Sequence, residues 1–250
     1  NLAKKYGPMM HLQLGEVSAV IVSSPQVAKE VMKTHDLVFA NRPQLLSVEI
    51  LSNNSPSLTF SPYGASWRQL RKVCVLELLS AKRVQSFELI REEEVENLIE
   101  AISMTSPQVP IDISKMIFSM TNNITARAAF GKKCEHKDEF IAAMKTITEL
   151  SGGFSVPDLF PSFKILHSLS GAKPALEKVH RKVGQILEDI IEEHKANRRD
   201  MSSNMLHKED LVDVLLRVQE SGDLEIPIST NTLKSVILEM FIGGTDTSST

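Results

Sequence analysis

The sequence has few of the residues that mark extracellular, membrane-spanning or nucleic-acid-binding proteins. Two cysteines in 250 residues cannot form a disulfide framework, which suits a reducing compartment. No apolar run approaches the roughly 20 residues that a membrane span needs. Lysine and arginine (28) do not outnumber aspartate and glutamate (31), and aromatic residues make up only 5% of the chain. We therefore expect neither the basic surface nor the base-stacking platform of a nucleic-acid-binding protein.

The residues that are present predict a mainly α protein with one small β element. The hydrophobic content of 42% is ample for a large core. Two β-prone runs, Met10–Leu14 and Ala19–Ser23, flank a turn and predict a hairpin near the start. Apolar residues then recur at helical spacing. This spacing predicts helices over residues 67–79, 83–102, 113–130, 138–150, 176–194 and 209–219, and a last helix capped by Ser229.

Other segments lack a helical period. Serine, asparagine and proline are frequent between Leu45 and Gly64, and a second irregular segment begins at Gly152. Long loops in compact domains are usually functional or mobile, so we expect these two segments to line a pocket. The run Glu92-Glu93-Glu94 is interpreted as the solvated face of its helix. The residues turned inward are expected to be Val95, Leu98, Ile99 and Ile102.

The end of the chain changes character abruptly. Apolar helical residues lead into Gly243-Gly244, followed by Thr245, Asp246 and Thr247. One interpretation is a helix C-terminus followed by a hydroxyl-rich loop. The other is a helix that continues and is locally opened, with the Thr247 hydroxyl bonded to the carbonyl of Gly243. Asp246 and Thr247 would then supply an acid and a hydroxyl for proton transfer. The local pattern leaves both interpretations open.

A second candidate site lies on the helix predicted to begin near Trp67. Trp67 and Arg71 are four residues apart, so the indole and the guanidinium share one helix face. This pair is suited to bind a carboxylate or a phosphate. The alternative, commoner among proteins in general, is a surface basic patch beside a half-buried tryptophan.

Other catalytic or metal-binding patterns are missing. The sequence contains no Ser-His-Asp arrangement, P-loop or HExxH motif, and its seven histidines are not in ligand spacing. Cys134-Glu135-His136 is a weak metal signal, and we interpret it as a solvated turn.

Together these motifs resemble the cytochrome P-450 superfamily. Gly243-Gly244-Thr245-Asp246-Thr247-Ser248 resembles its oxygen-activating motif, and Trp67-x-x-x-Arg71 is similar to its helix C motif. Further segments resemble the plant branch that oxidises terpenoids, alkaloids and phenylpropanoids. They are residues 39–43 (FANRP), 60–64 (FSPYG), 122–131 (NNITARAAFG), 158–161 (DLFP) and 209–216 (EDLVDVLL). The resemblance covers essentially the whole chain and about the N-terminal half of a family member.

The resemblance implies a role for each candidate residue. Trp67 and Arg71 would hydrogen-bond the haem propionates. Gly243 and Gly244 would let the long central helix pass close over the haem. Asp246 and Thr247 would deliver the protons that drive cleavage of the O–O bond. Substrate contacts would come from residues 45–62, residues 152–170 and the first half of the last helix.

One departure from the family pattern concerns the iron ligand. In the family this is a cysteine thiolate in a Phe-x-x-Gly-x-Arg-x-Cys-x-Gly loop, and neither Cys74 nor Cys134 has that context. We expect the family's Glu-x-x-Arg helix motif, which belongs to its C-terminal half, and its N-terminal membrane anchor to be missing from these residues too. We therefore expect residues 1–250 to be one partial domain ending within the long central helix, without the axial ligand and the C-terminal half.

Three functions follow from the resemblance. The first is a haem-dependent monooxygenase that hydroxylates small lipophilic plant metabolites with O2. Its electrons would come from NADPH through cytochrome P-450 reductase, and the intact protein would lie on the cytosolic face of the endoplasmic reticulum membrane. The second is a truncated, non-catalytic helical fragment that binds no haem by itself. The third is a family member with isomerase or dehydratase chemistry, against which Asp246 and Thr247 argue because such enzymes need no proton relay.

Overall fold

The computed structural model describes residues 2–53, 55–106, 108–133, 137–152, 155–163, 171–200 and 209–249; the side chains of residues 137, 138, 200 and 246 are not described. Most of these residues are helical, as the sequence predicts. In chain order the elements are α1 (Leu2–Tyr6), β1 (Met9–Leu14), β2 (Val17–Val22), α2 (Pro25–Lys29), the π-helical turn η1 (Glu30–Thr34), α3 (Asp36–Phe39), α4 (Leu46–Ser52), α5 (Ala65–Val73), the π-helical turn η2 (Cys74–Leu78), α6 (Ala81–Ser86), α7 (Glu88–Met104), α8 (Ile113–Phe130), α9 (Lys137–Leu150), α10 (Val156–Leu159), α12 (Ala172–Asp200), α13 (Leu211–Ser221) and α14 (Thr230–Ser249).

The predicted hairpin is confirmed. Strands β1 and β2 pair antiparallel, from Met9 opposite Val22 to Leu14 opposite Val17. Gly15 occupies the turn at a φ of +65°, a conformation that favours glycine. The Glu16 N–H donates to the Leu159 carbonyl at 2.8 Å, so the hairpin turn docks on α10.

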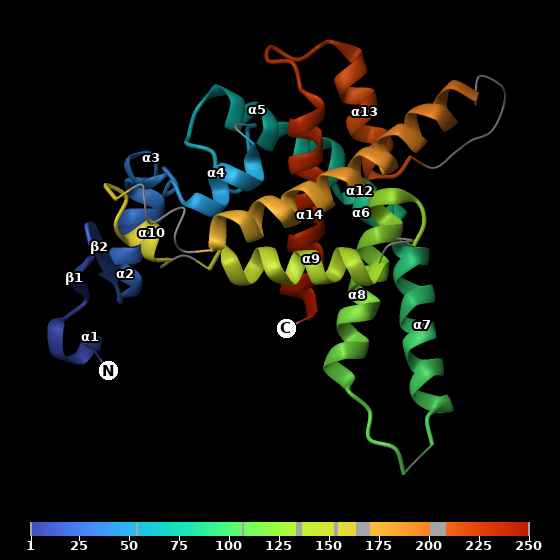
Figure 1. Ribbon diagram of the computed structural model, residues 1–250, viewed down its shortest axis with the longest axis horizontal. Coiled ribbons are helices and arrows are strands. Elements are labelled where there is room, and N and C mark those ends of the chain that lie inside the picture. The colour runs from blue at the N-terminus through green and yellow to red at the C-terminus, as the bar shows by residue number, and fades with distance from the viewer. Residues whose placement is uncertain are drawn as a thin grey trace.

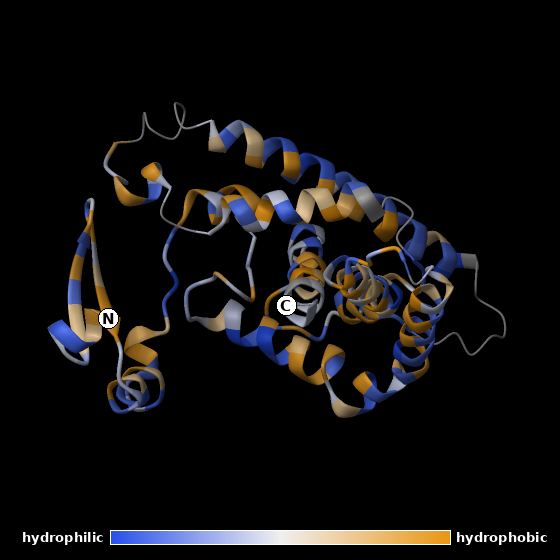
Figure 2. Cartoon of the chain, turned by 90° about the horizontal axis from the view of Figure 1, so that it is seen from below, coloured by the Kyte–Doolittle hydropathy of each residue, from blue (hydrophilic) through white to orange (hydrophobic). Residues whose placement is uncertain are grey.

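Helix α14 lies at the centre of the helical part (Figure 1). It packs mainly against α8 and also contacts α4, α12 and α13. Figure 2 views α14 end-on, with other helices on several sides of it. The Phe241 ring stacks on Phe130 of α8 at 5.7 Å and meets the edge of Phe140 of α9 at 4.7 Å. These fully buried rings anchor α14 in the core.

The start and the end of α14 can each be compared with a prediction from the sequence. At its start, the Ser229 hydroxyl oxygen accepts a hydrogen bond from the Thr232 N–H at 3.1 Å, so the predicted cap is confirmed. Near its end, the helix continues through Gly243 and Gly244 to Ser249. The interpretation of the glycine pair as a helix C-terminus is therefore wrong.

The segment from Leu45 to Gly64 is not irregular throughout, because α4 forms within it. Helix α4 lacks a side-chain cap from its own neighbours. Instead the Leu46 N–H donates to a carboxylate oxygen of Asp158 at 2.9 Å, 112 residues away in sequence. Leu46 and Val48 are buried. The local sequence hides this helix because its cap and its burial come from distant segments.

The interpretation of the acidic run on α7 is wrong at Glu94. Only 2% of Glu94 is exposed, whereas Val95 and Ile99, predicted to face inward, are 41% and 57% exposed. Helix α7 turns Glu94 toward α8, where Arg127 and Asn123 bond its carboxylate. A charged contact between helices thus overrides the apolar pattern.

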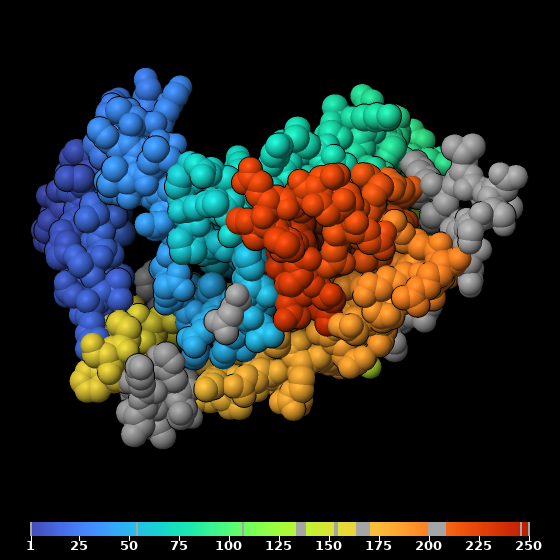
Figure 3. Space-filling view, turned by 90° about the horizontal axis from the view of Figure 1, so that it is seen from above, coloured from blue at the N-terminus to red at the C-terminus, as the bar shows by residue number. Residues whose placement is uncertain are grey.

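Figure 3 shows the surface of α13 and the start of α14 between α5 and α12. Among the described helices none is long and apolar enough to cross a lipid bilayer. The Cys134-Glu135-His136 turn lies outside the described residues.

Candidate functional site

The predicted hydrogen bond within the closing stretch of α14 is present. The Thr247 hydroxyl donates to the Gly243 carbonyl oxygen at 2.5 Å. Thr247 is exposed, so its hydroxyl oxygen can still accept a hydrogen bond from a group outside the helix. Asp246 lies on α14 next to it, and its side chain is among those not described.

The two glycines of this stretch face different surroundings. A Cβ added to Gly244 would lie 3.0 Å from the Thr125 hydroxyl oxygen and 3.2 Å from its methyl carbon on α8. A Cβ added to Gly243 would meet no described atom within 4 Å. Gly244 therefore allows close packing of α14 on α8, while Gly243 borders open space.

Thr245, the next residue, is buried against α8. The Thr121 hydroxyl donates to its carbonyl oxygen at 3.4 Å. Its own hydroxyl oxygen has no hydrogen-bond partner among the described atoms. Buried hydroxyl groups are usually hydrogen-bonded, so the Thr245 side chain is an exception in the core of the described structure.

An apolar cavity of about 420 Å³ adjoins Gly243. Its walls come from α4, the residues after it, α9 and α14. The residues that line it are Val48, Leu51, Ser52, Ser57, Thr59, Phe60, Ile147, Thr148, Ser151, Gly152, Ser235, Leu238, Glu239, Ile242 and Gly243. Two of the three segments predicted to contact substrate, residues 45–62 and the first half of α14, meet around this cavity, whereas the described part of residues 152–170 contributes only Gly152. Residues 153, 154 and 164–170 lie outside the described ranges. Helix α9 is a wall that the sequence did not predict.

Trp67 and Arg71 lie together on α5, as their spacing predicts. The guanidinium carbon of Arg71 is 5.3 Å from the centre of the Trp67 ring, a cation–π distance. Arg71 is exposed, and in the described part of the chain no carboxylate pairs with it. The Trp67 indole N–H, predicted to reach a haem propionate, instead donates to the Leu58 carbonyl at 2.9 Å. Direct donation by Trp67 would require it to exchange that bond.

Leu58 connects the two candidate motifs. Its carbonyl accepts from Trp67, and its N–H donates to the Glu239 carboxylate of α14 at 2.9 Å. Glu239 lies one helical turn before Gly243. The sequence interpretation missed Glu239. The available signal was an acidic residue alone in an apolar helical stretch.

Cys74 has the surroundings of a core residue. It is 1% exposed and belongs to the same buried cluster as Leu70 and Val73. Burial, followed by the nearby charge of Glu239, raises the pKa of the thiol to about 12. The thiol is therefore protonated at neutral pH and unsuited to be an iron thiolate.

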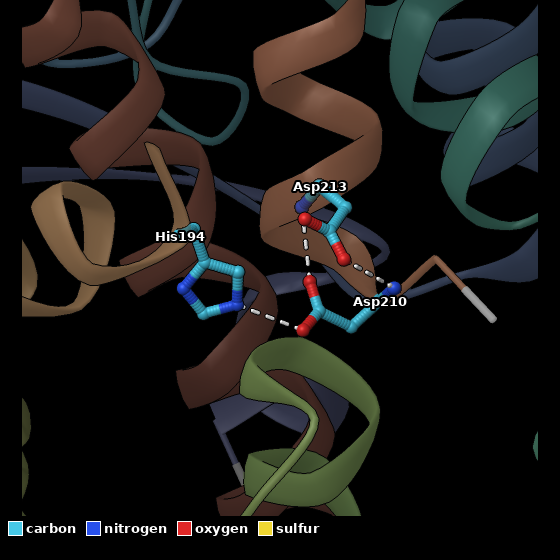
Figure 4. Close-up of side chains that lie close together, drawn as sticks. All are labelled: His194, Asp210 and Asp213. Atoms are coloured by element: carbon cyan, nitrogen blue, oxygen red, sulfur yellow. Dashed lines mark hydrogen bonds and ion pairs between the residues drawn. The ribbon is translucent and has the colours of Figure 1, made fainter. Parts of the chain in front are cut away.

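A buried polar cluster joins α12 to the start of α13 (Figure 4). His194, Asp210 and Asp213 place potential ligand atoms within 4.8 Å of one another. His194 Nε2 is 2.8 Å from an Asp210 carboxylate oxygen, and Nδ1 is 2.7 Å from the Ile190 carbonyl oxygen. Because both partners are acceptors, both ring nitrogens carry protons, and the cluster is an ion pair instead of a metal site. Burial is the largest influence and opposes this charge, but the hydrogen bonds to Asp210 and Ile190 and the negative charges of Asp210 and Asp213 together outweigh it and raise the pKa of His194.

Comparisons with known proteins identify first the fold and then the family. Two solved zebra fish cytochrome P450 structures, one with abiraterone and one with progesterone, superpose with TM-scores of 0.76 and 0.77. Each covers the whole chain at 21% and 22% identity, and the chain covers 54% and 56% of them. A family model described as cytochrome P450 matches residues 1–250. The chain belongs to the cytochrome P450 family.

Several curated plant proteins match the whole chain. Desmethyl-deoxy-podophyllotoxin synthase of Sinopodophyllum hexandrum is 52% identical, and premnaspirodiene oxygenase of Hyoscyamus muticus is 50% identical. Germacrene A hydroxylase of Barnadesia spinosa is 48% identical. In each case the match covers the full chain and 49–50% of the relative. The chain spans about half the length of the curated relatives it matches.

Features of the described residues fit the haem that the family implies. Arg71 is an exposed cation held on α5 without an acidic partner in the described ranges, and haem propionates are carboxylates. Gly243 leaves open space beside α14 next to an apolar cavity. Cys74, by contrast, does not fit the axial thiolate.

Proposed function

We propose that the protein containing this chain is a haem-dependent monooxygenase that hydroxylates small lipophilic plant metabolites. One atom of O2 enters the substrate, and NADPH supplies electrons through a cytochrome P450 reductase. The membership of the chain in the family supports this proposal, as do relatives named oxygenase and hydroxylase. The observation that carries it is the Thr247–Gly243 arrangement at the edge of the apolar cavity.

The haem, when bound, supplies the activation of O2, and this chain supplies its surroundings. The Arg71 guanidinium would bind a propionate, with Trp67 supporting it by stacking. Gly243 would leave room for the flat ring beside α14. Gly244 keeps the helix close to α8, in addition to the haem-facing role predicted for it.

Asp246 and Thr247 would move protons to the cavity. The Thr247 hydroxyl is held by the Gly243 carbonyl, so its oxygen is fixed in place and can accept a further hydrogen bond. Asp246, adjacent on the helix, would exchange protons with the solvent. The mostly apolar walls of the cavity would bind a lipophilic substrate and exclude water from it.

The domain and its location belong to the same proposal. Residues 1–250 would form part of a single cytochrome P450 domain, with the iron ligand provided from outside these residues. The environment of Cys74 supports that placement. The intact protein would act at the cytosolic face of the endoplasmic reticulum membrane.

Replacing the hydroxyl of Thr247 tests the proposal. In the intact protein, Thr247→Ala should uncouple oxygen consumption from product formation, with product formed per O2 falling on the order of tenfold or more. Thr247→Ser keeps a hydroxyl and should restore most of the coupling. The measurement is product formed per O2 and per NADPH consumed.

Ser248→Ala is the matched control, because Ser248 is an exposed hydroxyl on the same turn. It should leave the coupling unchanged. Tight coupling in the Thr247→Ala variant would contradict the role given to Thr247. The absence of a thiolate-type carbon monoxide difference spectrum in the intact wild-type protein would contradict the haem proposal itself.

A further inference from the structure

Glu239 is the one ionisable residue between Lys234 and Asp246 in the sequence of α14. Its neighbours Val236, Ile237 and Phe241 are fully buried. Glu239 is one of the residues that line the apolar cavity, and it is only partly exposed. A carboxylate in such a place is costly unless hydrogen bonds compensate its lost hydration, so its partners indicate its role.

Both oxygens of the Glu239 carboxylate accept hydrogen bonds from neutral donors. The Ser57 hydroxyl donates to one oxygen, and the Leu58 N–H donates to the other at 2.9 Å. Each carboxylate oxygen therefore accepts a hydrogen bond from residues 57–58. The Thr59 N–H and the Ser235 hydroxyl also lie near the carboxylate and act to lower its pKa. Within the described ranges no cation forms an ion pair with it.

The hydrogen bonds to Glu239 fix residues 57–60, a segment without regular secondary structure. Residues 57–60 lie between α4 and α5 and belong to no helix or strand. The segment is bonded internally: the Ser57 N–H donates to the Ser61 hydroxyl oxygen at 2.7 Å, and the Phe60 N–H donates to the Ser57 hydroxyl oxygen at 2.9 Å. Glu239 is its polar connection to α14.

Residues 57–60 contact the apolar cavity on one side and α5 on the other. Toward the cavity, Ser57, Thr59 and Phe60 contribute to the wall. Toward α5, the Leu58 carbonyl accepts from the Trp67 indole, which stacks on Arg71. Leu58 thus connects Glu239 of α14 with Trp67, which stacks on Arg71, the residue at which a haem propionate would bind.

We propose that Glu239 is a positioning residue, whose carboxylate fixes residues 57–60 against α14 and so sets one wall of the cavity and the place of Trp67 and Arg71. Both of its oxygens already accept hydrogen bonds from this segment, which favours a positioning role over contact with the substrate. Burial raises the pKa of Glu239 although its hydrogen bonds oppose this, which agrees with a group surrounded by neutral donors. The consequences for haem and substrate rest on the proposed function; the hold on residues 57–60 does not.

Amide hydrogen exchange on the intact, haem-bound protein tests the hold directly. Glu239→Leu removes every acceptor, so the amides of residues 57–60 should exchange about tenfold faster or more, the change expected from losing hydrogen bonds to a charged group. Glu239→Gln can accept from Leu58 and donate to Ser57, and it should preserve most of the protection. Glu225→Gln, an exposed acid before α14, is the control and should change nothing in this segment.

Ser57→Ala removes the hydrogen bond from the Ser57 hydroxyl to Glu239 without changing any residue of α14. It should raise exchange in the same segment even if Glu239→Leu proves too unstable to study. Unchanged exchange of residues 57–60 in Ser57→Ala and in a folded Glu239→Leu variant would overturn the proposal.

Spectra separate the positioning role from the proposed function. Glu239→Leu should weaken the binding of a lipophilic substrate, read as a shift of the haem spectrum, by about fivefold or more, while the amplitude of the carbon monoxide difference spectrum is kept. Glu239→Gln should restore binding. Equal binding in all three proteins would overturn the inferred effect on the cavity. A wild-type protein without any haem spectrum would overturn the proposed function, and the exchange experiment would still decide the hold on residues 57–60.

Discussion

Glu94 of α7 and Glu239 of α14 are both carboxylates that folding withdraws from water, and the chain compensates them in opposite ways. Glu94 accepts from Asn123 at 2.8 Å and Arg127 at 2.9 Å, and Lys133 lies 3.1 Å away. Burial alone would raise the pKa of Glu94, but these partners outweigh it and lower the pKa. Glu239 has neutral donors, and burial dominates its pKa, which is raised.

The opposite pKa shifts of the two carboxylates match their different places: Glu94 connects two helices, and Glu239 lies at a candidate site. Glu94 joins α7 to α8 and lines none of the cavity beside α14. Its cationic partners make it part of an ordinary ion-pair network. The hydrogen bonds of Glu239 compensate its desolvation only in part, because burial still raises its pKa, and such partly compensated groups beside a cavity are typical of functional regions.

The largest expected effect comes from breaking the Glu94 network. Glu94→Leu should lower the free energy of unfolding by about 2–3 kcal/mol, because Arg127 loses its buried partner. Its lowered pKa means that this contribution is fully present above the ordinary value of 4.5 and is lost as pH falls through the lower folded-state pKa. Urea denaturation followed by circular dichroism at neutral and acidic pH measures both changes.

Glu92→Leu is the matched control on the same acidic run, since Glu92 is exposed. It should change stability by less than about 0.5 kcal/mol. Equal effects of the two substitutions would mean that the run is solvated throughout, as the sequence alone suggested.

A smaller effect is expected at His194, where the buried charge is positive. The pKa of His194 is raised in the folded state, so its pair with Asp210 stabilises the fold fully below the ordinary value of 6.5 and is lost as pH rises through the folded-state pKa. His194→Gln should cost about 1–2 kcal/mol at pH near 6 and progressively less at higher pH. The exposed His11, replaced by Gln, is the control; a gap that does not depend on pH would contradict the ion pair.

At Cys74, close to Glu239, the expected effect is on reactivity and leaves stability unchanged. With its pKa raised to about 12 and its side chain buried, Cys74 should react with iodoacetamide at least on the order of 100-fold more slowly than an exposed thiol. Mass spectrometry of the Cys74 peptide measures the rate in the native protein. The rate should stay low in Glu239→Gln. Rapid labelling of the wild type would show that this part of α5 and η2 opens.

The elements that sequence predicted are those whose signals are local. The hairpin follows from two β-prone runs around Gly15, and α14 from its apolar period and the Ser229 cap. The Thr247 bond to Gly243 follows from a spacing of four residues. Helix α4 could not be predicted in this way, because its first N–H is capped by Asp158, 112 residues away.

The same reason explains what was missed at the site. The pairing of Trp67 with Arg71 is local and was predicted, but the commitment of the indole N–H to Leu58 depends on a loop that no periodicity describes. Glu239 contacts residues about 180 positions earlier, so its partners are not visible in sequence.

The two adjacent glycines of α14 set two separate dimensions of this region. At Gly244 the dimension is the spacing of two helices, because Thr125 of α8 lies where a methyl group would be. At Gly243 it is the width of the cavity, because a methyl group there would project into empty space. The same change to alanine would therefore push the helix outward at one position and narrow the cavity at its neighbour. Of these two adjacent glycines, Gly244 therefore sets the distance between α14 and α8, and Gly243 forms part of the cavity wall.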